Sequence, residues 1–505
     1  MKRLRNFAQA LAATCLALSV APAFADKAND TLKVAFTGEI NNVDSYFNTT
    51  RGGVVLQRAI WDGLVHRDTA TGEYVGNLAT SWEWIDDTTL EFKLREGVVF
   101  HDGSPFTADD VVGTVEFIAN PDSGVVTQRF VSWLAGAEKI DDLTVRLNLA
   151  EVFPSALEYL SGPISIYPSD YYAEVGPDGM GLKPIGTGPY RVESVKPGES
   201  YLLKKNEDYF DGPKGSPDIG TIDIRTIPDV NTQIAELFTG NINVAWRLPS
   251  DLAQKLDGTP GVMVTSASSI RVGFLMMDSA GRTGDTPLTD VRVRQAINHA
   301  INRQEMVDSL LKGGSKVVNT PCFPEQFGCV QEYVEYQYDP EKAKALLAEA
   351  GYDDGLSIEI YAFSNQDYVE AVAGYLSQVG ITLDIKMLKF PAVLDKMMND
   401  AAPMVFMSSG SWSLNDVSAI ISEFFKHGAV DFARDDEILE WLDVADTAVD
   451  PEVRKEYYGK AIMKITEQAY WAPMFSYNTF YAFTDDVDYT PTNDEILHFV
   501  NMKWK

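Results

Sequence analysis

Residues 356–387, LSIEIYAFSNQDYVEAVAGYLSQVGITLDIKM, carry the pattern that decides the fold class. Apolar residues alternate with polar ones at 358–360 and again at 381–387, which predicts two strands. Between them, apolar residues recur at helical spacing, namely Val369, Val372, Leu376 and Val379. A strand, a helix and a strand in succession favour parallel, right-handed pairing of the strands. The sequence therefore predicts an α/β fold.

The surrounding second half alternates long helical patterns with isolated strands. Apolar spacing predicts helices over three ranges: 293–311, 340–350 and 451–468. Gly313-Gly314 would end the first helix. Asp339 and Asp450 each precede a proline, so each is expected to cap the helix that follows.

The first half has a different pattern, with more sheet. Residues 90–94 and 143–149 alternate apolar and polar, which predicts half-buried strands. Thr107-Ala108-Asp109-Asp110 is a capping box expected to open a helix. If the aromatic-rich tail at 472–481 returns to this half, the chain crosses between the halves more than once, as in a hinged protein.

The first 25 residues have the pattern of a secretory leader. Lys2, Arg3 and Arg5 precede an apolar run from Leu11 to Val20, and Ala23-Phe24-Ala25 follows. We expect cleavage before Asp26 and a mature protein in the periplasm.

The chain is strongly acidic: its 505 residues contain 42 Lys+Arg and 73 Asp+Glu, a formal net charge of -31. Removing the leader takes away three positive charges, which leaves 39 against 73, or -34. Such a surface repels nucleic acid and anionic membranes, because both are polyanions. Nucleic acid is not an expected partner.

After cleavage two cysteines remain, Cys322 and Cys329, in a loop rich in proline and glycine. In an exported protein they most simply form one disulfide, which we expect on a surface loop.

Enzyme signatures are missing from the sequence. It contains no G-x-S-x-G, H-E-x-x-H, G-x-x-x-x-G-K-[ST] or G-x-G-x-x-G, and its five histidines include no pair at helical metal-ligand spacing. His101-Asp102-Gly103 is explained as a turn. We therefore predict no catalysis, cofactor or metal. A secreted hydrolase that uses His101 and Asp102 remains the alternative from another class.

Several aromatic residues stand beside polar turn residues, among them Trp246, Trp412 and Tyr477. Aromatic faces with a few hydrogen-bonding neighbours bind small polar organic ligands, although packing between lobes would use the same residues. Arg271 lies in an apolar stretch, where its guanidinium needs either a protein carboxylate or a ligand as its partner.

Five blocks in order then match a known family: 78–82 (LATSW), 92–111 (FKLREGVVFHDGSPFTADDV), 186–190 (GTGPY), 290–297 (DVRVRQAI) and 339–351 (DPEKAKALLAEAG). The chain resembles extracellular solute-binding protein family 5, the periplasmic receptors of dipeptide, oligopeptide and nickel ABC transporters. The resemblance implies a monomeric, two-lobed Venus-flytrap protein without catalysis. Its closed form would be presented to a membrane permease with two ATPase subunits.

The resemblance also implies how the chain is divided, with an extra subdomain in the first lobe. We expect a leader at 1–25, a first-lobe core at 26–45, 165–266 and 475–505, the extra subdomain at 46–164, and the second lobe at 267–474.

One motif departs from the family pattern. In peptide-binding members a W-x-x-D pattern in the second lobe supplies an acid to the ligand's free amine. Here Trp412 matches, but Asn415 takes the place of the acid and Asp416 follows one step later. An amide cannot neutralise an ammonium as a carboxylate does. A standard free-amine peptide therefore requires Asp416 to substitute.

We predict a receptor for a small polar organic solute, with a short peptide as the leading hypothesis. The predicted ligand contacts are Trp412 as a stacking wall, Asn415 and Asp416 as polar anchors, Arg271 for a carboxylate, and Trp246 and Tyr477 near the lobe boundary. A carbohydrate or opine is the second hypothesis, since Asn415 and aromatic rings suit hydroxyls. A nickel or metallophore receptor fits less well with so few histidines, and a chemoreceptor could read the closed form instead of a permease.

Overall fold

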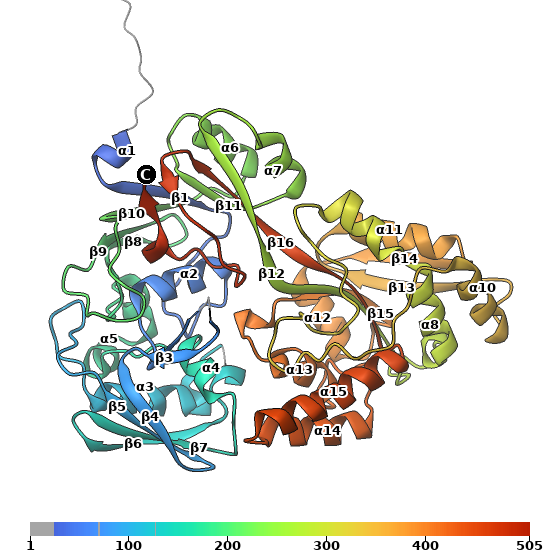
Figure 1. Cartoon of the computed structure of the whole chain (residues 1–505), viewed down its shortest axis with the longest axis horizontal. Helices are drawn as coiled ribbons and strands as arrows, with labels where there is room; N and C mark the ends of the chain where they lie inside the picture. The colour runs from blue at the N-terminus through green and yellow to red at the C-terminus, as the bar shows by residue number, and fades with distance from the viewer. Residues whose placement is uncertain (1–24, 69–70, 127) are drawn as a thin grey trace, which may run out of the picture.

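The structure is a computed structural model that describes residues 25–68, 71–126 and 128–505. The predicted leader lies outside the described residues except for Ala25. The described chain forms two lobes connected by a pair of long strands that run diagonally between them (Figure 1). The C-terminus returns to the first lobe, beside β1 (Figure 1).

A ten-stranded sheet extends through both lobes in the order β14-β13-β15-β12-β16-β11-β1-β10-β9-β8. Its first-lobe strands are β1 (Thr31–Phe36), β8 (Tyr190–Lys196), β9 (Ser200–Lys205), β10 (Thr221–Thr226) and β11 (Val244–Leu248). Its second-lobe strands are β13 (Leu356–Ala362), β14 (Ile381–Met387) and β15 (Met404–Ser409).

The strands β12 (Val262–Met277) and β16 (Trp471–Thr484) belong to both lobes. β16 pairs with β11 of the first lobe at one end, while β12 pairs with β15 of the second lobe at the other. The two strands pair with each other antiparallel, and their register shifts between Ser268 and Val272. The expected boundaries at 266–267 and 474–475 fall inside these strands, and the exact division of the chain stays a prediction. We call β12 and β16 the hinge strands.

The first lobe also carries a separate four-stranded sheet, in the order β4-β5-β7-β6. Its strands are β4 (Ala79–Asp86), β5 (Thr89–Leu94), β6 (Leu134–Asp141) and β7 (Thr144–Leu149), with α3 (Ala108–Ala119) packed against it. The capping box is confirmed, since the Thr107 amide donates to Asp110 Oδ2 at 2.9 Å. One continuous apolar core joins this sheet to the rest of the lobe.

The remaining first-lobe elements lie outside these two sheets. They are α1 (Ala25–Ala28), α2 (Arg51–Ile60), β2 (Val65–Arg67), β3 (Tyr74–Gly76), α4 (Ala156–Ser161), α5 (Ser169–Leu182), α6 (Val230–Phe238), α7 (Ser250–Leu256), β17 (Val487–Asp488) and β18 (Lys503–Trp504).

Helices surround the second-lobe part of the sheet (Figure 1). They are α8 (Val291–Ala300), α9 (Arg303–Met306), α10 (Pro340–Glu349), α11 (Gln366–Ser377), α12 (Phe390–Met398), α13 (Ile421–Phe425), α14 (Asp436–Thr447) and α15 (Pro451–Glu467). The predicted strand-helix-strand unit is confirmed, because β13 and β14 pair in parallel with α11 between them in the sequence. Asp339 and Asp450 cap α10 and α15 as expected.

The prediction of one continuous helix over 293–311 is wrong. Helix α8 ends at Ala300, and Ile301 is extended, with φ -92° and ψ 117°. Asn302 then caps α9 by accepting a hydrogen bond from the Glu305 amide at 3.1 Å. An asparagine side chain that caps a new helix competes with continuation of the old one, although the apolar spacing is unchanged.

Cys322 and Cys329 form the predicted disulfide, but its expected place on a surface loop is wrong. Both residues are buried, at 0% and 6% exposed, in the apolar core of the second lobe. The loop they close is held against residues 414–417: the Phe327 amide donates to Asn415 O at 2.9 Å, and the Val417 amide donates to Phe327 O at 3.0 Å. The loop therefore supports the segment that contains the unusual Asn415 and Asp416.

None of the helices in the described ranges combines the length and the apolar character that crossing a bilayer requires.

Candidate ligand site between the lobes

A cavity of about 660 Å³ lies beside the hinge strands. Its walls come from four parts of the chain. They are residues 247–251 of the first lobe, Arg271 and residues 477–480 of the hinge strands, Leu311, Ser315, residues 363–368 and Ser408 of the second lobe, and Glu495 near the C-terminus. The volume lies within the range of small-molecule sites. Because both lobes and the hinge contribute, a bound molecule would contact every part that moves on closure.

A buried carboxylate organises one wall of the cavity. Glu495 is 4% exposed. Arg271 donates from Nε and Nη2 to its two oxygens, both at 3.1 Å, and Arg51 Nη2 lies 3.1 Å from Oε2. Burial raises the pKa of Glu495, but Arg271 and Arg51 outweigh burial and lower that pKa to about 2. The sequence allowed two kinds of partner for Arg271, a protein carboxylate or a ligand. In the structure its partner is a protein carboxylate, that of Glu495.

Arg247 reaches the same cavity from an irregular strand. The register of β11 against β16 shifts between Trp246 and Leu248, and Arg247 at this bulge has φ 56°. Trp246 is 4% exposed and packs against Phe36 in the first-lobe core, with ring centroids 5.8 Å apart, while Arg247 is exposed. A bulge redirects a side chain in this way. Among the described residues, Arg247 makes no hydrogen bond and no ion pair.

The second lobe contributes an acid and aromatic rings. Asp367 lies in the first turn of α11, is exposed, and lines the cavity. Within the described ranges it makes neither an ion pair nor a hydrogen bond. Tyr368 lies next to Tyr477 of β16, with ring centroids 6.2 Å apart, and both line the cavity. Among the described residues, the cavity therefore offers one unpaired cation, one unpaired anion and an aromatic wall.

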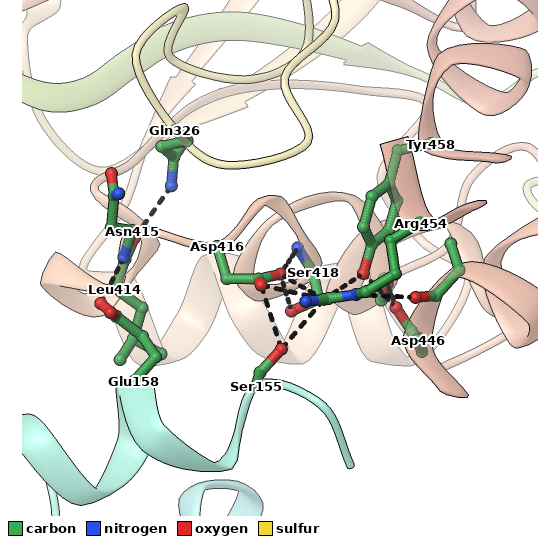
Figure 2. A network of polar contacts seen from close by, with 12 residues as sticks. Ser155, Glu158, Gln326, Leu414, Asn415, Asp416, Ser418, Asp446, Arg454 and Tyr458 are labelled. Carbon is green, nitrogen blue, oxygen red and sulfur yellow. Dashed lines mark hydrogen bonds and ion pairs between the residues drawn. The ribbon is translucent and has the colours of Figure 1, made fainter. Parts of the chain in front are cut away.

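Three of the predicted contact residues lie elsewhere, in a second contact between the lobes, and two of them, Asn415 and Asp416, are seen in Figure 2. Asp416 forms an ion pair with Arg454, with Oδ2 and Nη2 2.9 Å apart and both side chains buried. Ser155, from the first lobe, donates to Asp416 Oδ2 at 3.0 Å. The amide and hydroxyl of Ser418 donate to Oδ1 at 3.0 and 2.7 Å. The Asp416 carboxylate thus has a full set of protein partners.

The backbone of Asn415 takes part in the same contact (Figure 2). Its amide donates to Glu158 Oε1 of the first lobe at 2.6 Å, and its carbonyl accepts from the Phe327 amide. Trp412 also reaches the first lobe, with its ring edge-on to Phe130 at a centroid distance of 5.6 Å. We call Ser155, Glu158, Asn415, Asp416 and Arg454 the peripheral contact.

Of the six predicted contact residues, the structure brings Arg271 and Tyr477 together in the cavity. Trp246 lies in the core behind the cavity. The other three lie at the second contact between the lobes: Trp412, Asn415 and Asp416. Whether each binds ligand stays a prediction. Sequence reasoning missed Arg247 and Asp367. The alternating pattern of the sequence indicates only that Arg247 lies on a strand, not that it faces a cavity. Asp367 did not stand out either, because acidic residues are common in the first turn of a helix.

The family profile of bacterial extracellular solute-binding proteins, family 5, matches residues 73–431. The chain belongs to this family. A curated relative is the glutathione-binding protein GsiB of Salmonella typhi, 27% identical over 480 residues that cover 92% of each chain. This relative is a binding protein rather than an enzyme.

Solved structures confirm the fold of this family member. A dipeptide-binding protein from Pseudoalteromonas sp. SM9913 in complex with Met-Leu has a TM-score of 0.79 at 21% identity, covering 94% of this chain and 100% of that one. MoaA of A. tumefaciens R10 in complex with mannopinic acid has a TM-score of 0.77 at 23% identity, covering 94% and 99%. The predicted α/β, two-lobed binding-protein fold is therefore confirmed.

Proposed function

We propose that this family 5 protein is the periplasmic receptor of an ABC importer, and that it captures a short peptide in the cavity beside the hinge strands. Its closed form delivers the peptide to a permease with two ATPase subunits, and the protein itself performs no catalysis. The carrying observation is that the first lobe, the second lobe and the hinge strands all line one cavity of about 660 Å³. A ligand there favours closure because it contacts both lobes at once.

A peptide is favoured by the chemistry of the cavity and by the relatives. Arg247 and Asp367 provide opposite charges, and Tyr368 and Tyr477 provide apolar faces with polar tips. GsiB is named for glutathione, and the Pseudoalteromonas protein holds Met-Leu.

An opine is the second candidate. The fold of MoaA accommodates mannopinic acid, and Asn415 replaces the acid expected for a free-amine peptide. Both ligand classes carry carboxylates, so the charge of the cavity alone does not separate them. Trp412 and Asn415 remain proposed contacts for either class, reached when the lobes move.

The deciding experiment is native mass spectrometry of residues 26–505, purified from a periplasmic extract without denaturation. The intact mass is compared with the denatured mass, and the released molecule is sequenced. A released di- or tripeptide supports the proposal, whereas a released opine supports the second candidate.

If nothing is released, thermal unfolding is followed with an equimolar tripeptide library and with mannopinic acid, because a ligand of the folded state raises Tm. A rise with mannopinic acid alone overturns the peptide proposal. Cleavage of the library during incubation would contradict a purely binding role, with His101→Ala as the test variant for the hydrolase alternative.

A further inference from the structure

The charged groups that line the cavity differ in whether another protein group pairs with them. Glu495 is held by Arg271 and Arg51, and Asp251 pairs with Lys255 at 3.1 Å. Two lining charges are left without a protein partner among the described residues: Arg247 from the first lobe and Asp367 from the second. Both side chains are exposed at the cavity wall, where none of the described residues pairs with them, so a charge of each sign in one cavity fits a ligand that carries both.

The backbone at Arg247 supports this argument independently. A φ of 56° is unfavourable for a residue with a Cβ, and glycine would adopt it without strain. The neighbouring residues pair normally, with Trp246 opposite Tyr481 and Leu248 opposite Phe480. Strain kept at one bulge next to a cavity is typical of a functional position. Its effect here is to turn the guanidinium out of the strand and into the cavity.

The local electrostatics favour an anion at this wall. Arg51 and Arg271 both face Glu495. Although Arg247 is exposed as a residue, partial desolvation of its guanidinium lowers its pKa, and Glu495 is near enough to raise that pKa and Arg271 to lower it. Around Glu495 three guanidinium groups face one carboxylate, which leaves a local excess of positive charge, although the cavity lining as a whole carries three acids (Asp251, Asp367 and Glu495) and two arginines (Arg247 and Arg271). This contrasts with the whole mature chain, whose formal charge is -34 (39 against 73). Arginine also binds a carboxylate through two parallel hydrogen bonds.

We propose that Arg247 binds the terminal carboxylate of a peptide and Asp367 its terminal ammonium, so that the pair selects short peptides with both ends free. This inference rests on the proposed peptide function and deepens it. Asp416, the acid nearest the family's usual position, is occupied by Arg454, Ser155 and Ser418. Asp367 supplies a free carboxylate instead. Because Arg247 and Asp367 belong to different lobes, a peptide bound by both ends also holds the lobes closed.

The test uses the mature protein and one equimolar tripeptide library in three forms: free, C-terminally amidated, and N-acetylated. Binding is measured by isothermal titration and by the rise in Tm. For the wild type we expect amidation and acetylation each to weaken binding roughly 10- to 100-fold, the range for losing a charge-assisted hydrogen bond. Arg247→Gln should bind the free and amidated libraries equally weakly, and Asp367→Asn should bind the free and acetylated libraries equally weakly.

Two matched controls separate charge pairing from general damage. Arg191→Gln changes an exposed arginine on β8, and Asp170→Asn changes an exposed acid in the first turn of α5, both away from the cavity. Both controls should keep the wild-type preference for free ends. If Arg247→Gln binds the free library with wild-type affinity and still discriminates against amides, the inference is wrong while the peptide proposal stands. If no form of the library binds the wild type, both are overturned.

Discussion

The cavity beside the hinge strands and the peripheral contact both bring residues of the two lobes together, yet they differ in how their charges are satisfied. In the peripheral contact, Asp416 has an arginine and two serines as partners, and Glu158 accepts from Asn415 and Tyr74. In the cavity, Arg247 and Asp367 have no protein partner among the described residues. A region whose charges are all paired can hold a conformation, whereas unpaired charges can bind a ligand.

This comparison explains why the acid after Trp412 does not identify the ligand. Asp416 lies within a position of the family's anchor, but its partners come from the second lobe and from Ser155 of the first. The same carboxylate cannot also neutralise an ammonium without giving up Arg454. The partners of a residue in the structure therefore indicate its role better than its nearness in sequence to a binding motif does.

The largest effect is expected from removing Arg454. Arg454→Met leaves the buried Asp416 carboxylate without its cation, which should lower the free energy of unfolding by about 3–5 kcal/mol. Urea unfolding followed by circular dichroism measures this. Asp416→Leu combined with Arg454→Met should lose less than Arg454→Met alone, because no buried charge is left unpaired. The half-buried neighbour Lys455→Met is the control, and an Arg454→Met variant as stable as this control would show that the pair is not structural.

The second prediction concerns Glu495, the paired charge of the cavity. Its pKa is lowered from 4.5 to about 2, so its contribution to stability is fully present above pH 4.5 and is lost as the pH falls through 2. By linkage this contribution is about 3 kcal/mol at neutral pH. Urea unfolding should show Glu495→Gln less stable than wild type by about that much at pH 7, and by about half as much at pH 3.

The exposed Glu96→Gln is the matched control for Glu495 and should show no such pH dependence. A difference between Glu495→Gln and wild type that stays constant from pH 7 to pH 3 would mean that Arg271 and Arg51 do not hold an ionised Glu495. Arg271 would then be available to a ligand, as the sequence first suggested.

Most of the fold could be predicted from the sequence because periodicity reports which face of an element is buried. The unit at 356–387 and the helix that begins at Pro451 follow directly from spacing and caps. The break at Ile301 could not be predicted in this way, because a cap by Asn302 leaves the apolar spacing intact. The burial of Cys322 and Cys329 depends on packing against residues far away in the sequence.

The site was less predictable for a related reason. Arg271 and Tyr477 do line the cavity, since residues on the hinge strands lie near the lobe boundary by topology. The sequence favours Trp246 rather than its neighbour Arg247 as a ligand contact, because alternation along a strand does not reveal the bulge that turns Arg247 toward the cavity. The sequence also does not show which charged side chains form ion pairs. Nothing in it therefore distinguishes Asp416, which pairs with Arg454, from Asp367, which has no partner among the described residues.

The third prediction, with a smaller expected effect, distinguishes contacts that stabilise the fold of one lobe from contacts that hold the two lobes together. Ser155→Ala removes two hydrogen bonds between the lobes, the one that its hydroxyl donates to Asp416 and the one that it accepts from Arg454, and this should disfavour the closed form by about 1.5 kcal/mol. Small-angle scattering of the ligand-free protein should then show a larger radius of gyration. Affinity for the free tripeptide library should fall roughly tenfold, since less of the protein is in the binding conformation.

Ser418→Ala is the control, because its hydroxyl donates to the same Asp416 carboxylate from within the second lobe. It should lower the free energy of unfolding by a similar amount, while leaving the radius of gyration unchanged. Equal opening in both variants would mean that the peripheral contact stabilises the second lobe only.

The smallest effect has the opposite sign and tests the cavity itself. Because Arg247 has φ 56°, Arg247→Gly relieves backbone strain and should raise the free energy of unfolding by about 1 kcal/mol. The same change removes the guanidinium, so affinity for the free tripeptide library should fall together with the preference over amidated ends. Arg191→Gly, at a position of β8 that pairs with Lys204 of β9, should instead lose about 0.5–1 kcal/mol and keep wild-type binding. A gain in stability with a loss of binding would show that the strained backbone is kept for the ligand, whereas a loss of both would show that Arg247 supports the fold.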